Sequence, residues 1–148
     1  FWTSEKQKLE TDEHLKPLFT FADRNLTPIR DRLNLLDRET EIVPGVRAVQ
    51  ASGHTPGQMA LTISSGGEQL LLTADAVLHP IHVEEPDWYS IVDYDPPGAV
   101  ATRRRLLNQA VEERALVLAF HFPFPGLGNI IKKGKSRRWQ PIYSRKIV

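Results

Sequence analysis

The sequence predicts an α/β domain in which outer helices cover a mixed sheet. Segments with helical periodicity alternate with short apolar strands, and 148 residues with 41% hydrophobic and 25% charged side chains suffice for one core. The sequence contains no cysteine, which excludes disulfides and thiolate ligands. No apolar run approaches the roughly 20 residues of a membrane span, so we expect no membrane partner. No basic start precedes an apolar stretch, so no signal peptide is visible. The sequence leaves the compartment unknown, with the cytoplasm slightly favoured.

The first part of the chain is predicted to be helical. Apolar residues recur at three- and four-residue steps over residues 12–36, which is typical of an amphipathic helix. Thr27 and Pro28 mark a point where this helix can split into two. Short extended segments follow over residues 33–52, around the turn at Pro44 and Gly45.

The rest of the chain supplies strands and a second helix. Residues 59–63 and 69–73 flank a turn that contains two glycines, which predicts a β-hairpin. Residues 98–114 are predicted as a helix, and residues 115–120 as a short buried strand. Residues 129–148 have β-like apolar pairs in a basic background. We expect residues 1–148 to form one domain.

Three polar residues follow predicted strands. His54 opens a loop after a strand, and Asp75 lies just past the second strand of the hairpin. His121 comes directly after the predicted strand of residues 115–120. Side chains at strand ends can converge on one cleft. Two imidazoles and one carboxylate suit zinc, manganese or iron. Each residue taken alone can also be structural: His54 as a loop histidine, Asp75 as the cap of a loop and His121 as a core histidine.

The context of these residues resembles a known family. The string Gly53-His54-Thr55-Pro56-Gly57, a hairpin, Thr73-Ala74-Asp75 and a strand ending at His121 are similar to the second half of the metallo-β-lactamase fold. Residues 1–5, the long helix and residues 122–128 resemble the lactonase-like and methyl-parathion-hydrolase-like branch. The resemblance implies the C-terminal half of an αββα sandwich, a mixed sheet with outer helices.

The resemblance also implies roles for individual residues. His54 would bind the first metal, Asp75 would bridge two metals as the catalytic carboxylate, and His121 would bind the second metal. The cofactor implied is a divalent metal, zinc above all, with two ions in the complete enzyme. A metal-bound hydroxide would then attack an ester, a lactone or a phosphotriester.

Four further residues are candidates for contact with a small-molecule substrate. They are His79, Phe122, Phe124 and Leu127, which follow Asp75 or His121 in the chain. Leu78 stands where lactonases of this fold often have a tyrosine. Gln58 stands where the family usually has a second histidine after the glycine.

The family's His-x-His-x-Asp-His motif is absent from this sequence. We therefore expect a fragment that lacks the N-terminal half of the sandwich and hydrolyses little or nothing alone. Its exposed sheet would be covered by the missing half or by self-association, so we expect an oligomer or an unstable monomer. A non-catalytic fragment or interaction module that retains the fold is the alternative.

Charge is unevenly distributed along the chain, although the net charge is +1. Residues 101–148 hold 11 of the 19 Lys and Arg but 2 of the 18 Asp and Glu. We favour mutual neutralisation of the two parts, and we interpret Arg103-Arg104-Arg105 as a solvated helix surface. The basic segment 132–139 makes a nucleic-acid-binding member the second alternative, and we regard nucleic acid as an unlikely partner.

Overall fold

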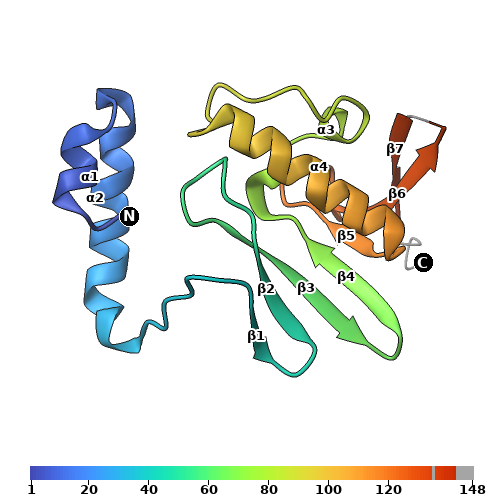
Figure 1. The fold of residues 1–148 in the computed structure, drawn as a ribbon, viewed down its shortest axis with the longest axis horizontal. Helices are drawn as coiled ribbons and strands as arrows, with labels where there is room; N and C mark the ends of the chain where they lie inside the picture. The colour runs from blue at the N-terminus through green and yellow to red at the C-terminus, as the bar shows by residue number, and fades with distance from the viewer. Residues whose placement is uncertain (135, 143–148) are drawn as a thin grey trace. The chain divides into compact units, whose positions relative to one another are not determined.

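The structure, a computed structural model, describes residues 1–134 and 136–142 (Figure 1). The chain divides into two compact units, Phe1–Asp37 and Arg38–Val148. The expectation of a single domain over residues 1–148 stays a prediction.

The first unit is helical. Its elements are α1 (Glu5–Glu10), η1 (Glu13–Leu15), α2 (Lys16–Leu26) and η2 (Thr27–Arg32). The predicted split at Thr27 and Pro28 is confirmed: the α-helix ends at Leu26 and a 3-10 helix follows, because Pro28 has no N–H for a helical bond. Helix α1 was not expected from the sequence, and the Ser4 hydroxyl caps it by accepting the N–H of Gln7 at 3.3 Å.

The second unit is built on one seven-stranded sheet. Its strands are β1 (Thr40–Val43), β2 (Val46–Gln50), β3 (Met59–Ser65), β4 (Glu68–Leu72), β5 (Leu116–Leu118), β6 (Leu127–Lys133) and β7 (Ser136–Pro141). Their order in the sheet is their order in the sequence. Neighbours are antiparallel except β4 and β5, which are parallel. The predicted hairpin is therefore β3–β4. The β-like pairs predicted over residues 129–148 lie in the β6–β7 hairpin as far as Pro141, and residues 143–148 lie outside the described residues.

Helix α4 (Pro96–Glu112) makes the crossover between the two parallel strands and covers one face of the sheet (Figure 1). Its buried Leu106, Leu107 and Ala110 pack in one core cluster with Leu71 and Val117 of the sheet. This core fixes the strands from whose ends the candidate site residues emerge. Between β4 and α4 lie η3 (Ala74–Ala76) and α3 (Ile81–Glu84), two short helical turns in a region predicted as loop.

The opposite face of the sheet is apolar and partly exposed. Strand register places one row of side chains on this face, and none of them belongs to the buried core cluster. They are Leu61, Ile63, Leu70, Leu72, Leu116 and Leu118. An apolar face of this kind is suited to packing against a further layer of structure. In the described part of the chain, no helix combines the length and apolarity that crossing a membrane requires.

Candidate functional site

The three predicted ligand residues follow strands that run in the same direction. Strand β3 is antiparallel to both β2 and β4, and β5 is parallel to β4. Strands β2, β4 and β5 therefore end at one edge of the sheet, which we call the carboxyl edge. His54 follows β2, while Asp75 and His121 each lie three residues beyond the ends of β4 and β5. The edge of an α/β sheet at which parallel strands end is a common place for a binding site.

Asp75 and His121 are brought together at this edge. His121 Nε2 lies 3.1 Å from Asp75 Oδ1, and the side chains are 57% and 40% exposed. The pairing of the strands continues past their ends, because the N–H of Thr73 donates to the carbonyl of Leu118 at 3.1 Å. Two residues 46 positions apart in the sequence thus present neighbouring oxygen and nitrogen atoms to solvent.

His54 has a different partner. Its Nδ1 lies 2.9 Å from Asp93 Oδ1, and the two side chains are 15% and 0% exposed. The other carboxylate oxygen of Asp93 accepts the N–H of Ser90 at 2.8 Å. Asp93 was not singled out in the sequence, where it is one acid of a loop rich in Asp, Pro and aromatic residues.

A buried arginine lies behind Asp93. Arg103 of α4 is fully buried, and its Nη2 lies 3.8 Å from Asp93 Oδ2. Its Nε donates to the carbonyl of Ala76 at 2.8 Å, and its Nη1 donates to the carbonyls of Pro86 and Trp88. Burial lowers the pKa of Arg103, while the charges of the nearby Asp93 and Asp87 act to raise it.

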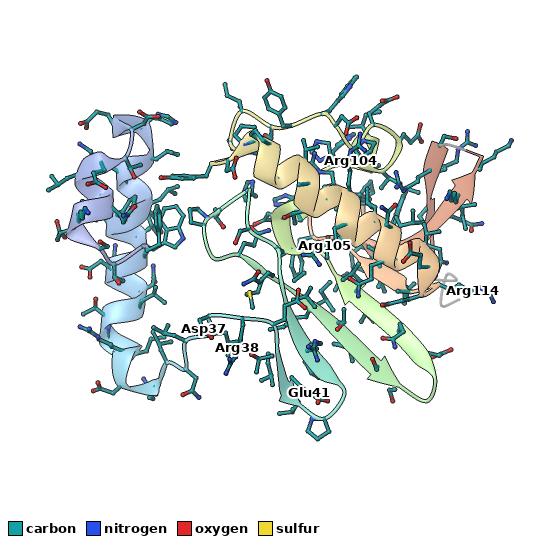
Figure 2. All side chains as sticks on the ribbon, viewed as in Figure 1. Asp37, Arg38, Glu41, Arg104, Arg105 and Arg114 are labelled. Atoms are coloured by element: carbon teal, nitrogen blue, oxygen red, sulfur yellow. The ribbon has the colours of Figure 1, made fainter. Side chains whose placement is uncertain are left out.

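The interpretation of residues 103–105 as a solvated surface was therefore wrong for Arg103. Arg104 and Arg105 do lie on the exposed side of α4 (Figure 2), where Arg104 pairs with Asp87 and Arg105 donates to the carbonyl of Gln50. A signal was present in the sequence. Arg103 lies three and four residues before the core residues Leu106 and Leu107, on the buried face of the helix.

The loop that carries His54 is tied to the start of α4. The carbonyls of Gly53 and His54 accept the N–H groups of Asp95 and Tyr94, at 2.9 and 3.0 Å. The Thr102 hydroxyl donates to the carbonyl of Ser52 at 2.6 Å. Gly53 has a φ of +138°, and a Cβ there would lie 2.3 Å from the backbone nitrogen of Ala99. A glycine is required at this position because helix and loop approach so closely.

Asp75 and His121 have donor atoms at a spacing that suits a metal ion. Two ligands of a tetrahedral zinc ion, each about 2.0–2.2 Å from the metal, lie roughly 3.3 Å apart. The 3.1 Å between Asp75 Oδ1 and His121 Nε2 is close to that spacing, and both atoms are of types that zinc binds. Among residues 1–134 and 136–142, however, no group of three or more His, Cys, Asp or Glu side chains is arranged to hold a metal. The pair fits a cation, and His54 does not join it in one cluster.

The four predicted substrate contacts are placed differently from one another. Phe122 is 6% exposed and packs edge-on against Trp139, so its ring contributes to the core. Phe124 is 90% exposed. Leu127 begins β6 opposite Leu118, and His79 is exposed with its Nδ1 accepting the N–H of Ile81 at 3.1 Å. Their role in contacting a substrate stays a prediction.

Two more polar side chains lie near this edge. His82 of α3 is 6% exposed, and its Nδ1 accepts the N–H of Leu78 at 3.3 Å. Burial, and then the charge of Arg103, lower the pKa of His82 to about 4. Gln58 accepts the Thr55 hydroxyl at its Oε1, while its buried Nε2 has no hydrogen-bond partner in the described part of the chain.

Other features of the second unit lie away from this edge. A cavity of about 570 Å³ is found at the opposite edge, where its lining includes Leu70, Leu116 and Arg114. In the basic hairpin β6–β7, the ring of Trp139 packs edge-on against Phe122. Lys135, which belongs to the predicted basic segment, lies outside the described residues.

No family model matches the chain. The N-acyl homoserine lactonase AiiA from Bacillus thuringiensis subsp. kurstaki is 28% identical over 110 residues, which are 74% of this chain and 40% of the relative. The solved structure of AidC, a dizinc quorum-quenching lactonase in complex with a product, matches 99% of this chain and 52% of its own, with a TM-score of 0.84 and 28% identity. The hydrolase AbOPH of the beta lactamase superfamily matches with a TM-score of 0.84 and 24% identity, over 99% of this chain and 53% of its own.

The chain thus spans about half the length, or less, of the proteins it matches. The matched structures share its mixed seven-stranded sheet and outer helices, as the sequence resemblance implied. In sequence and fold the chain is therefore similar to metallo-β-lactamase superfamily hydrolases, lactonases among them, and its partial coverage of these proteins is consistent with the C-terminal half of their αββα sandwich.

Proposed function

We propose that this chain provides part of the metal site of a hydrolase, with Asp75 and His121 as ligands. The observation that carries the proposal is the 3.1 Å approach of Asp75 Oδ1 to His121 Nε2 at the ends of the two parallel strands. Both side chains are partly exposed, so a cation and a substrate can reach them from solvent. His54, at the same edge, is the third ligand that we assign, and Asp75 is the residue that we assign to bridge two ions.

The metal that we propose is zinc, and it would supply an acidified water as nucleophile and a positive charge for the developing oxyanion. The similarity to a dizinc lactonase supports this choice. Asp75 and His121 would hold the cation, and their partial exposure would leave it accessible to solvent. An ester, a lactone or a phosphotriester is the substrate class that we propose, and the lactonases among the relatives favour a lactone.

The site also needs groups that this chain does not place beside the pair. A structural zinc site has four ligands and a catalytic one has three, whereas the described residues bring two donors together. The partly exposed apolar face of the sheet supports a second layer of the sandwich that contributes the rest. We therefore expect the isolated 148 residues to hydrolyse far less than the whole protein.

The test is hydrolysis by the zinc-loaded whole protein. An N-acyl homoserine lactone, an aryl ester and an aryl phosphotriester are offered to the wild type and to the variants Asp75→Asn and His121→Ala. We expect hydrolysis of at least one substrate by the wild type and rates near background for both variants. His14→Ala, which changes an exposed histidine of the first unit, is the matched control and should keep the wild-type rate.

Two results would count against the proposal. If the zinc-loaded wild type hydrolyses none of the three substrate classes, the chain acts as a non-catalytic module that retains the fold. If Asp75→Asn and His121→Ala hydrolyse as fast as His14→Ala, the reaction takes place elsewhere.

A further inference from the structure

We propose that Asp93, backed by Arg103, is a positioning residue that determines which ring nitrogen of His54 carries the proton. In this arrangement Nδ1 of His54 is protonated and donates to Asp93, and Nε2 keeps a free lone pair. The assignment of that lone pair to a metal rests on the proposed function. The position of the proton does not.

The Asp93 carboxylate has three polar neighbours. Oδ2 accepts the backbone N–H of Ser90 at 2.8 Å, and Arg103 Nη2 lies 3.8 Å from the same oxygen. Oδ1 lies 2.9 Å from His54 Nδ1. An ionised carboxylate has acceptors and no donor, so the hydrogen between Oδ1 and Nδ1 belongs to the imidazole. A neutral imidazole carries one such hydrogen, which leaves Nε2 as an acceptor or a ligand.

Burial makes this arrangement specific. The Asp93 side chain is 0% exposed and that of His54 is 15% exposed, so water does not replace either partner easily. A buried carboxylate needs a counter-charge, and the fully buried Arg103 provides it. Arg103 is itself fixed, because it donates to the backbone carbonyls of Ala76, Pro86 and Trp88.

The same arginine connects the two halves of the candidate site. Ala76, whose carbonyl accepts Arg103 Nε at 2.8 Å, directly follows Asp75. One guanidinium thus contacts the segment that carries Asp75 and the carboxylate that contacts His54. Groups that hydrogen-bond the second nitrogen of a ligand histidine orient its ring, and their loss typically weakens metal binding about 10- to 100-fold.

The variant Asp93→Asn gives a sharp expectation. Ser90 donates to one side of residue 93, so the amide of the variant turns its carbonyl oxygen toward Ser90 and its NH₂ toward His54. Nδ1 of His54 must then accept a hydrogen bond, and the ring proton moves to Nε2. The variant changes one atom of the side chain and leaves its shape unchanged.

The experiment uses the metal-free protein with ¹⁵N-labelled histidine at pH 8, where the two-bond ¹H–¹⁵N correlations distinguish the protonated ring nitrogen from the bare one. The His54 signals are assigned by their loss in His54→Gln. We expect protonated Nδ1 in the wild type and protonated Nε2 in Asp93→Asn. The matched control is Asp87→Asn, the same change at an exposed carboxylate paired with Arg104, and it should keep the wild-type pattern.

A wild-type His54 with its proton on Nε2 overturns the proposal, and so does an unchanged pattern in a folded Asp93→Asn. If that variant does not fold, the wild-type spectrum alone decides. A zinc titration then separates this proposal from the proposed function. We expect about 10- to 100-fold weaker zinc binding in Asp93→Asn. A wild type that shows protonated Nδ1 but binds no zinc supports the positioning role and contradicts the metal site.

Discussion

Two pairs of a carboxylate and an imidazole lie at the same edge of one sheet, and they differ in surroundings. Asp75 and His121 are 40% and 57% exposed, and each contributes one atom to a 3.1 Å contact that faces solvent. Asp93 and His54 are 0% and 15% exposed, and a buried arginine lies behind the carboxylate. The exposed pair can separate to admit a cation between its atoms, whereas the buried pair holds one nitrogen so that the other is left free.

The comparison teaches that burial, together with a nearby arginine, decides whether a carboxylate and an imidazole stay paired with each other or are free to bind something else. In water, a contact between Asp and His contributes little to stability, so an exposed pair is free to bind something else. In the interior, an unpaired carboxylate is costly, so Asp93 keeps its partners.

The largest effect is expected from removing the counter-charge of the buried pair. Arg103→Leu leaves the Asp93 carboxylate buried without its cation and three carbonyls without a donor, so the free energy of unfolding should fall by about 3–5 kcal/mol. Urea denaturation followed by circular dichroism measures it. Arg104→Leu, at the neighbouring exposed position, should leave the denaturation midpoint near the wild-type value. Similar losses in both variants would contradict the distinction between the two arginines.

Lowering the pH tests a third histidine, His82. Its Nδ1 accepts the backbone N–H of Leu78, whereas Nδ1 of His54 contacts a carboxylate. The pKa of His82 is about 4 in the folded chain and about 6.5 when unfolded, so the unfolded chain takes up a proton first as the pH falls. Stability supplied by neutral His82 is therefore complete above pH 6.5 and is lost between pH 6.5 and about 4, by about 3 kcal/mol.

The control for His82 is His82→Asn, whose side-chain oxygen can still accept the N–H of Leu78. Unfolding free energies measured from pH 7 to pH 4 should fall less steeply in this variant than in the wild type. Equal slopes would mean that His82 titrates normally in the folded chain.

A smaller loss is expected from the loop that carries His54. Gly53→Ala forces an alanine into a φ of +138° with its Cβ about 2.3 Å from the backbone of Ala99, at a cost of about 1–3 kcal/mol. Gly57→Ala is the matched control, because its φ is also positive but nothing lies within 4 Å of the added Cβ. Thermal unfolding should rank Gly53→Ala below Gly57→Ala, and the reverse order would contradict the close approach of loop and helix.

The smallest loss of stability is expected from replacing Asp95, which lies two residues after Asp93. Asp95 caps α4, and its Oδ1 accepts the N–H of Gly98 at 3.1 Å. Asp95→Ala should lower the free energy of unfolding by about 1 kcal/mol, as the loss of a helix cap does, and it should not move the ring proton of His54. A changed His54 spectrum in this variant would show that the loop, rather than Asp93 alone, controls the imidazole.

The sequence predicted the features that depend on local pattern and strand order. The hairpin of β3 and β4 follows from alternating apolar runs around two glycines, and the placement of Asp75 and His121 follows from the ends of apolar strands. Helix α1 was missed because its six residues bury no side chain, which leaves no apolar periodicity to detect.

The partner of His54 could not be found in this way. Asp93 lies 39 residues from His54, in an irregular segment where no periodicity shows which side chain turns inward. The spacing of Arg103 before Leu106 and Leu107 does indicate the buried side of the helix. Its acceptors could not be found in this way, because the carbonyls of Ala76, Pro86 and Trp88 lie 15 to 27 residues earlier in the chain. Contacts of this kind depend on how segments distant in the sequence pack together, and not on the local sequence pattern.

The central claim is that Asp75 and His121 bind a metal together at the carboxyl edge, and a zinc titration of the whole protein tests it most directly. Calorimetry compares the wild type with Asp75→Asn, His121→Ala and the exposed control His14→Ala. We expect the wild type and His14→Ala to bind zinc alike, and both edge variants to lose that binding. Undiminished zinc binding in Asp75→Asn and His121→Ala would contradict the account.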